Sequence, residues 1–142
     1  MADGWVLIDT SAWIHALRPT GNPVVRQQVY GLLTEGRTVT CEMIILELTS
    51  GTRTEGEFRE ICEDLEALQQ FPITKSVWRS AYGIAHAVRR KGLSIPTTDL
   101  LIAAVVLSYP CRLLHCDKHF DLMAHHIALP IWKPSAAKSD NG

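Results

Sequence analysis

The apolar residues of this chain fall into short continuous runs and into longer segments with helical spacing. The runs near residues 5–8, 38–41 and 112–116 have the length of short buried strands, and weaker strand signals lie at residues 71–74 (an edge strand at best) and 128–131. Elsewhere apolar residues recur every three or four positions, which predicts helices at residues 10–17, 23–35, 42–50, 54–70, 75–91, 97–108 and 118–126. Strands that alternate with helices predict an α/β fold, with a short, mainly parallel sheet and helices on both of its faces.

Capping residues and the polar end of the chain refine these boundaries. Asn22, which stands before a proline, predicts the start of a helix. We expect Thr97 or Thr98 to cap the most apolar helix of the chain. Residues 133–142 are polar and predict a disordered tail, so a single domain is expected over residues 1–132.

The composition narrows the class of protein. Of the 142 residues, 46% are hydrophobic and 20% are charged, as is typical of a globular domain. No apolar run approaches the roughly 20 residues of a membrane helix, and no secretory signal is evident, so we expect a cytoplasmic protein with four reduced cysteines. The net charge is −1, but six acidic residues gather within residues 55–66. The lysines and arginines elsewhere could form a basic rim around an acidic pocket, or belong to an ordinary mixed surface.

Four acidic residues stand at positions where α/β folds often carry chemistry. Asp9 and Asp117 each come directly after a predicted strand, and such folds bind ligands at the carboxyl ends of their strands. Asp99 lies in the first turn of the most apolar helix, and Glu47 lies in a helix so apolar that its carboxylate should be partly buried. Structural explanations remain open: Asp9 and Asp117 could be N-caps, Asp99 could serve the helix dipole, and Glu47 could be exposed or salt-bridged.

Together the four carboxylates predict a site for a hard divalent cation. Clustered carboxylates repel one another and raise each other's pKa unless a cation neutralises them. Mg²⁺ or Mn²⁺ suits a site made of oxygen atoms, and such an ion can activate water and stabilise the charge of an attack on phosphorus. Asp121, four residues after Asp117, could be a further ligand or a solvated side chain. Ser11 could orient a ligand or simply begin a helix.

Other groups of residues carry weaker signals. A stretch rich in histidine and cysteine could suggest structural zinc, but it has no Cys-x-x-Cys pair; its members are His115, Cys116, His119, His125 and His126. Several aromatic residues could stack on bases, or belong to the core or a dimer interface: Trp13, Trp78, Tyr82 and Trp132. Arg89 and Arg90 could contact phosphates together with Lys118, or could suit the end of a helix dipole.

The acidic residues lie in four short motifs: Val6–Ala12, Glu47–Gly51, Pro96–Ala104 and Cys116–Asp121. In this order the motifs resemble those of PIN-domain ribonucleases, with the closest likeness to the VapC-type toxins of bacterial toxin–antitoxin pairs. The resemblance covers nearly the whole chain and implies a PIN-like fold and a Mg²⁺- or Mn²⁺-dependent endoribonuclease in which Asp9, Glu47, Asp99 and Asp117 hold the metal. It also implies a homodimer, and a cognate VapB-type antitoxin that blocks the active-site groove. His119 departs from the basic or polar residue expected at its position.

The sequence therefore predicts an enzyme that hydrolyses RNA with a metal-activated water. An aspartyl-phosphate phosphatase also places an aspartate after its first strand, but that chemistry requires a second aspartate at the position of Ser11. The other alternative is a non-catalytic PIN-like module that binds RNA or protein. Against the module, carboxylates that cluster without a ligand would reduce the stability of the fold.

Overall fold

A four-stranded parallel sheet in the order β3-β2-β1-β4 forms the centre of the computed structural model, which describes residues 4–134. The strands are β1 (Trp5–Ile8), β2 (Thr38–Thr40), β3 (Gln69–Gln70) and β4 (Cys111–Leu114). The helices are α1 (Thr10–Leu17), α2 (Pro23–Thr34), α3 (Glu42–Ser50), α4 (Glu55–Glu66), α5 (Lys75–Arg90), α6 (Thr97–Ser108) and α7 (Lys118–Ala124). The predicted α/β class is confirmed.

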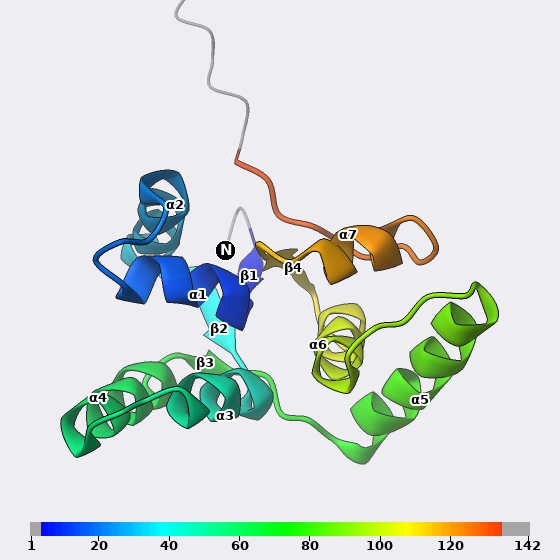
Figure 1. The fold of residues 1–142 in the computed structure, drawn as a ribbon, viewed down its shortest axis with the longest axis horizontal. Helices are drawn as coiled ribbons and strands as arrows, with labels where there is room; N and C mark the ends of the chain where they lie inside the picture. Colours follow the sequence, from blue (N-terminus) through cyan, green and yellow to red (C-terminus); the bar gives the residue numbers. More distant parts are fainter. Residues whose placement is uncertain (1–3, 135–142) are drawn as a thin grey trace, which may run out of the picture.

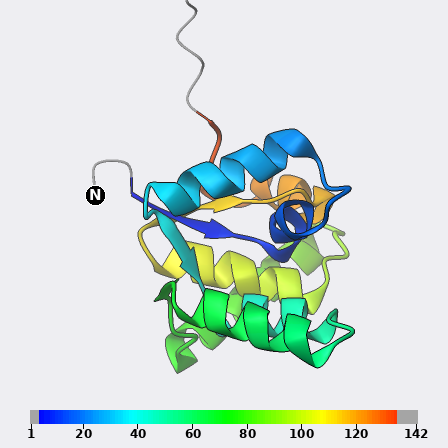
Figure 2. The same cartoon turned by 90° about the vertical axis from the view of Figure 1, so that its left-hand side faces the viewer.

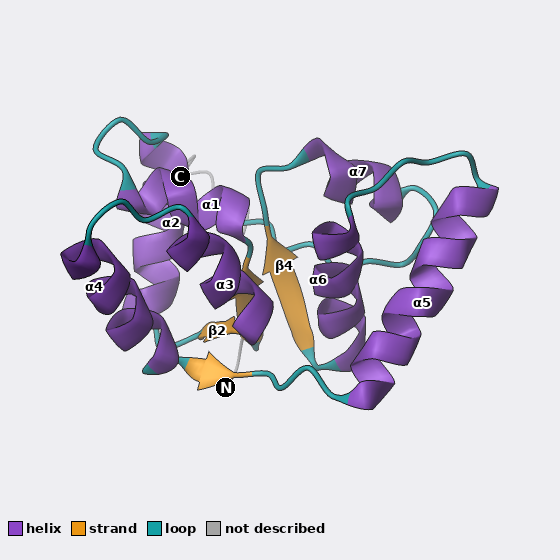
Figure 3. Cartoon of the chain, turned by 60° about the horizontal axis from the view of Figure 1, so that its bottom comes forward, coloured by secondary structure: helices purple, strands orange, loops and turns teal. Residues whose placement is uncertain are grey.

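Helices cover both faces of the sheet, α1 to α4 on one and α5 to α7 on the other (Figures 1 and 3). The strand order explains this division. The chain moves outward from β1 to β2 and β3, and then returns past β1 to form β4; Figure 2 shows β2, β1 and β4 side by side. Because parallel crossovers are right-handed, the outward and the returning connections must lie on opposite faces.

The core surrounds β1 and α6. The apolar residues 6–8 of β1 are fully buried, and every residue of α6 from Asp99 to Val106 is buried, so this helix is covered on all sides. The four parallel strands end at the same edge of the sheet. At that edge the chain leaves the neighbouring strands β1 and β4 toward opposite faces, and such a switch point is where open α/β sheets bind ligands.

The segment around β3 differs from the prediction. The helix predicted to continue to residue 70 ends at Glu66, and the edge strand is β3 rather than residues 71–74. The side-chain amide of Gln70 donates hydrogen bonds to the carbonyl oxygens of Leu65 and Leu68, at 2.8 and 3.0 Å. These bonds satisfy carbonyl groups at the end of α4, so the chain can leave the helix and pair with β2.

The start of α6 also differs from the prediction. Pro96, rather than Thr97 or Thr98, occupies the N-cap position. Its carbonyl oxygen accepts hydrogen bonds from the backbone N–H groups of Asp99 and Leu100, each at 3.1 Å. The helix therefore begins without a side-chain cap, and Asp99 lies in its first turn as expected.

The end of the described chain contains less regular structure than predicted. Residues 128–131 form no full strand, and a single bridge joins Ile131 to Leu113. Of the predicted disordered tail, residues 133–142, all but residues 133 and 134 lie outside the described part of the chain. Within that part, all four cysteines are unpaired, and no helix combines the length and the apolar character that a membrane crossing requires.

Candidate metal centre

Asp9 lies at the carboxyl end of β1 and is only 3% exposed. Its backbone N–H donates to the carbonyl oxygen of Leu114 at 2.9 Å, which joins the ends of β1 and β4. Its Oδ2 accepts two hydrogen bonds from Ser11, from the backbone N–H at 3.0 Å and from the hydroxyl at 2.6 Å. Asp9 is therefore the N-cap of α1, and Ser11 holds its carboxylate in place.

Asp117 repeats this arrangement after β4, as the N-cap of α7. Its Oδ1 accepts a hydrogen bond from the backbone N–H of His119 at 2.9 Å, and its own backbone N–H donates to Nδ1 of His115 at 3.1 Å. The hydroxyl of Ser11 accepts a hydrogen bond from the backbone N–H of Cys116, so Ser11 connects the Asp9 carboxylate to the chain just before Asp117. Both strand-end aspartates are caps, and both also face the same edge of the sheet.

Glu47 reaches this edge from α3 and is partly buried. Its Oε1 accepts a hydrogen bond from the hydroxyl of Thr10 at 3.1 Å, and Thr10 directly follows Asp9. This contact joins residues 37 positions apart, and nothing in the sequence singles out Thr10 as the partner of Glu47. Thr10 is therefore a residue of the site that the sequence analysis missed.

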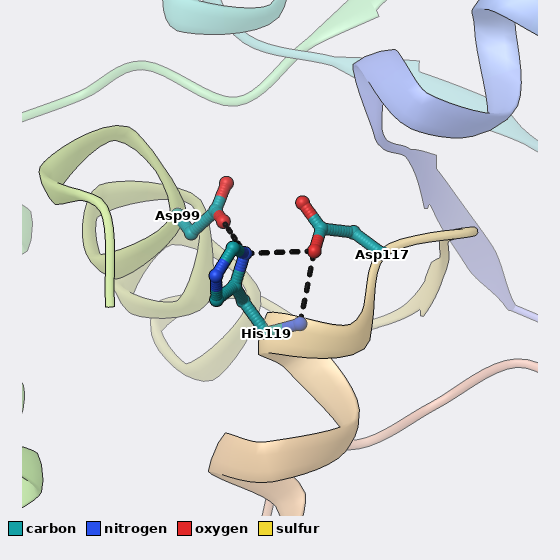
Figure 4. A group of neighbouring side chains, drawn as sticks. All are labelled: Asp99, Asp117 and His119. Atoms are coloured by element: carbon teal, nitrogen blue, oxygen red, sulfur yellow. Dashed lines mark hydrogen bonds and ion pairs between the residues drawn. The ribbon is translucent and has the colours of Figure 1, made fainter. Parts of the chain in front are cut away.

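Asp99 completes the group from the first turn of α6, where it is 7% exposed. Its Oδ2 lies 3.4 Å from Nδ1 of His119, and the same nitrogen lies 2.9 Å from Oδ1 of Asp117. Figure 4 shows the imidazole ring between the two carboxyl groups. One donor atom from each of Asp99, Asp117 and His119 lies within 4.8 Å of the others, a spacing that could hold a metal ion.

The electrostatics show that the four carboxylates, Asp9, Glu47, Asp99 and Asp117, share one region; we refer to them as the four-carboxylate cluster. Burial raises the pKa of Asp9, Glu47 and Asp99, and the negative charge of Asp117 raises each further. For Asp99, burial followed by the charges of Asp117, Asp9 and Glu47 raises the pKa to about 7. Hydrogen bonds from Ser11 and Thr10 oppose the shifts of Asp9 and Glu47. Such mutual repulsion is what a bound cation relieves.

Apart from Ser11, the accessory residues predicted from the sequence lie at the surface. Asp121 is exposed on α7, and its Oδ1 lies 3.6 Å from Nε2 of His115, so it pairs with that ring rather than joining the group of Asp99, Asp117 and His119. Lys118 is exposed at the first position of α7. Arg89 and Arg90 are exposed in the last turn of α5.

The cysteine- and histidine-rich stretch and the aromatic residues form no compact site in the described part of the chain. Cys116, His125 and His126 are exposed, and within residues 4–134 the only group spaced to hold a metal ion is that of Asp99, Asp117 and His119. Of the aromatic residues, Trp13 is buried, Trp132 is partly buried, and Trp78 and Tyr82 are exposed on α5 at 42% and 65%. The geometry therefore favours a centre based on carboxylates, with Asp99, Asp117 and His119 closest together, over a cysteine- and histidine-based zinc site; Asp9 and Glu47 lie outside this tightly spaced group.

Comparison with known proteins agrees with this fold. Residues 6–126 match the family described as the PIN domain. The chain is also 33% identical over 123 residues to ribonuclease VapC11 of Mycobacterium tuberculosis, a match that covers 84% of this chain and 91% of that relative. The chain therefore belongs to the PIN-domain family, among the VapC ribonucleases.

Solved structures share the same fold. VapBC2 from Rickettsia felis, crystallised bound to a DNA fragment from its promoter, includes a chain that matches with a TM-score of 0.72 at 14% identity, over 89% of this chain and 96% of that one. VapBC-5 from M. tuberculosis, described as a member of the VapBC family of toxin–antitoxin systems, matches with a TM-score of 0.63 at 18% identity, over 92% and 98%.

Proposed function

We propose that this protein is a metal-dependent endoribonuclease toxin that hydrolyses RNA phosphodiester bonds at the four-carboxylate cluster and is neutralised by a cognate VapB-type antitoxin. One observation carries the proposal: four acidic side chains from four separate elements converge at the switch point of the sheet, where burial and the negative charge of neighbouring carboxylates raise the pKa of Asp9, Glu47 and Asp99. Membership of the family that includes the VapC ribonucleases supports RNA as the substrate.

The residues present fit a divalent cation. Three buried or half-buried carboxyl groups have raised pKa values, and Nδ1 of His119 is a buried polar atom without a hydrogen-bond partner. Asp9, Glu47, Asp99 and Asp117 would hold the ion, and Mg²⁺ or Mn²⁺ suits their oxygen atoms. Such an ion lowers the pKa of water and neutralises charge that develops on the phosphate and the leaving oxygen.

The chain itself supplies orientation and proton transfer. Ser11 fixes Asp9 through two hydrogen bonds, Thr10 fixes Glu47 through one, and the first turn of α7 fixes Asp117. These contacts leave the remaining carboxylate lone pairs for the cation, and one carboxylate of the cluster accepts the proton of the attacking water. Asp121, which pairs with His115 at the surface of α7, has no role as a metal ligand in this proposal. Arg89, Arg90 and Lys118 contact RNA phosphates at the rim.

A groove of roughly 760 Å³ begins beside the cluster and offers a place for the antitoxin. Thr10 and Glu47 belong to its lining, together with exposed apolar side chains of α1 and α2, Leu17 and Tyr30. The lining also contains three acidic residues of α4, Glu57, Glu60 and Asp64, and two basic residues, Arg18 and Arg53. An antitoxin segment with apolar side chains and a few charged ones, mainly basic, would match this lining and block access to Glu47. The homodimer implied by the resemblance stays a prediction.

A cleavage assay tests the proposal directly. Total RNA is incubated with the purified protein in Mg²⁺, in Mn²⁺ or in chelator, and with the isosteric variants Asp9→Asn and Asp99→Asn. We expect cleavage by the wild-type protein only with a divalent ion, and none by either variant, while both variants keep their circular dichroism spectrum. Wild-type cleavage rates in the variants, or cleavage in chelator, would refute the metal-dependent mechanism.

The alternative of a binding module predicts a different response to metal. A module without a metal site would show no change in melting temperature with Mn²⁺, or the same change in the wild type and in Asp99→Asn. The phosphatase alternative loses support from the geometry, because Ser11 occupies the position of the second aspartate and is engaged with Asp9. Detection of a covalent phosphate on Asp9 would favour the phosphatase alternative again.

A further inference from the structure

The imidazole ring of His119 is the most unusual group in the centre. Its Nδ1 is buried, lies 2.9 Å from Oδ1 of Asp117 and 3.4 Å from Oδ2 of Asp99, and yet makes no hydrogen bond. At 2.9 Å the distance would allow one, so the oxygen of Asp117 lies off the axis along which this nitrogen could donate. Buried polar atoms that make no hydrogen bond are rare, and a bound ion is one explanation for them.

We propose that Nδ1 of His119 is a nitrogen ligand of the metal ion, and that it makes the centre select Mn²⁺ over Mg²⁺. This inference depends on the proposed function, because it assumes that the four-carboxylate cluster binds a divalent cation. It goes beyond the oxygen-only site that the sequence predicts, in which His119 has no role.

The distances fit donors that share an ion. Two ligands with bonds of about 2.1 Å lie about 3.0 Å apart in neighbouring octahedral positions and about 3.4 Å apart in tetrahedral ones. The two oxygens lie 2.9 and 3.4 Å from Nδ1 of His119. An ion among the three atoms would also explain why the oxygens flank the nitrogen rather than accept a hydrogen bond from it.

The other histidine beside the cluster has no such role. Nδ1 of His115 accepts a hydrogen bond from the backbone N–H of Asp117, so its lone pair is engaged, and its Nε2 faces the carboxylate of Asp121. His119, in contrast, is tied to Asp117 through the backbone N–H that bonds to Oδ1, so the ring and the carboxylate are held within one turn of chain. The pair is therefore preorganised as two neighbouring ligands.

The nitrogen donor sets the preference between metals. Carboxylate and water oxygens suit Mg²⁺ well, whereas imidazole nitrogen favours transition metals, among which affinity is lowest for Mn²⁺ and rises to a maximum at Cu²⁺. Replacing one oxygen ligand by Nδ1 of His119 therefore lowers the affinity of the centre for Mg²⁺ relative to its affinity for Mn²⁺. The loss of this ring should reduce Mn²⁺ affinity by about tenfold or more and Mg²⁺ affinity by less than about threefold.

Pulsed electron paramagnetic resonance on the full chain loaded with Mn²⁺ alone tests the ligand. We expect electron spin echo modulation from a directly bound nitrogen, and a change to the ¹⁵N pattern when only histidine is labelled with ¹⁵N. The modulation should be lost in His119→Ala and kept in His125→Ala, a matched control at the exposed end of α7. Isothermal titration with Mn²⁺ and Mg²⁺ then measures the selectivity of the same proteins.

The outcomes separate this inference from the proposed function. Saturable Mn²⁺ binding without nitrogen modulation, or modulation that survives in His119→Ala, would overturn the ligand assignment and leave the carboxylate centre intact. An equal loss of affinity for both metals would overturn the selectivity. Wild-type protein that binds no Mn²⁺ would overturn the metal centre itself. If His119→Ala fails to fold, the same measurement on His119→Gln decides the assignment, because uniformly labelled histidine in the wild type shows only that some histidine binds the ion.

Discussion

The hydroxyl of Ser11 donates a 2.6 Å hydrogen bond to the carboxylate of Asp9 and accepts another from the backbone N–H of Cys116 at 2.9 Å. One small side chain thus ties a carboxylate at the end of β1 to the chain that leaves β4. We expect Ser11→Ala to reduce RNA cleavage by about 10- to 100-fold, because Asp9 loses its orientation toward the metal. The free energy of unfolding should fall by only about 1 kcal/mol.

Ser108 provides a matched control for this variant. Its hydroxyl donates a 2.7 Å hydrogen bond to the carbonyl oxygen of Ala104 near the far end of α6. Ser108→Ala should leave the cleavage rate unchanged. Steady-state cleavage of a defined RNA and urea unfolding measure both quantities, and equal cleavage rates for the two variants would show that Ser11 does not position Asp9.

The stability of the metal-free protein should decrease as pH rises. The pKa of Asp99 is raised from 3.8 to about 7, chiefly by burial and then by the charge of Asp117. Between these values the folded state holds a proton that the unfolded chain releases, so the free energy of unfolding falls as pH increases through this window. The pKa values of Asp9 and Glu47 are also raised, so these groups likewise lower the free energy of unfolding as pH rises.

Asp99→Asn removes the contribution of Asp99 to this pH dependence. At pH 8 in chelator the variant should be more stable than the wild type by about 1 to 2 kcal/mol, after allowance for solvent screening and relaxation. At pH 4 the two should be nearly equal. Thermal melting from pH 4 to 8 measures this, with the exposed Asp121→Asn as control. Mn²⁺ should stabilise the wild type more at pH 8 than at pH 5, because protons compete with the metal. Identical pH profiles for wild type and Asp99→Asn would contradict the assignment.

Thr10 should act on catalysis through Glu47. Its hydroxyl donates a 3.1 Å hydrogen bond to Oε1 of Glu47, and Thr10→Val removes the hydroxyl while keeping the shape of the side chain. We expect cleavage to fall by about 10-fold and Mn²⁺ affinity to fall with it. Thr34→Val is the control, since the hydroxyl of Thr34 bonds only to the carbonyl oxygen of Tyr30 within α2. Unchanged Mn²⁺ affinity in Thr10→Val would show that the hydroxyl of Thr10 does not position Glu47 for metal binding.

Two glycines of the same helical hairpin should respond in opposite directions to alanine. A Cβ atom at Gly21 would collide with the backbone carbonyl of His15, so Gly21→Ala should destabilise the protein by more than about 1 kcal/mol. Gly31 is exposed within α2, and a Cβ atom there meets nothing within 4 Å. Gly31→Ala should therefore stabilise the protein by about 0.5 to 1 kcal/mol. Thermal melting of both variants checks the pair, and a stable Gly21→Ala would mean that this turn can rearrange.

The strand-end acids could be predicted from the sequence because the signals are local. Asp9 and Asp117 each follow an apolar run, and parallel strands must bring their ends together. Asp99 was predictable in the same way, since the helix that follows it is apolar on every side and therefore central. Partial burial of Glu47 followed from its apolar neighbours, although periodicity could not show which face of α3 would be buried: Leu46 is 60% exposed.

What the sequence could not provide depends on how separate elements pack. The contact of Thr10 with Glu47 requires the observed placement of α3 beside α1, and the position of His119 between two carboxylates requires the placement of α7 against α6. The misplaced edge strand has a similar cause, because the side chain of Gln70 ends α4 through contacts that no periodicity encodes.

Arg89 and Arg90 should affect RNA binding rather than the chemical step. Both are exposed in the last turn of α5, on the face of the sheet that also carries α6 and Asp99. If they contact phosphates, Arg89→Ala and Arg90→Ala should raise the KM for RNA severalfold, leave kcat nearly unchanged, and each reduce the slope of log affinity against log salt by about 0.7. Arg59→Ala is the control, because Arg59 is exposed on α4 and pairs with Glu55 at 3.3 Å. Salt slopes that stay at the wild-type value in both arginine variants would place the RNA elsewhere on the surface.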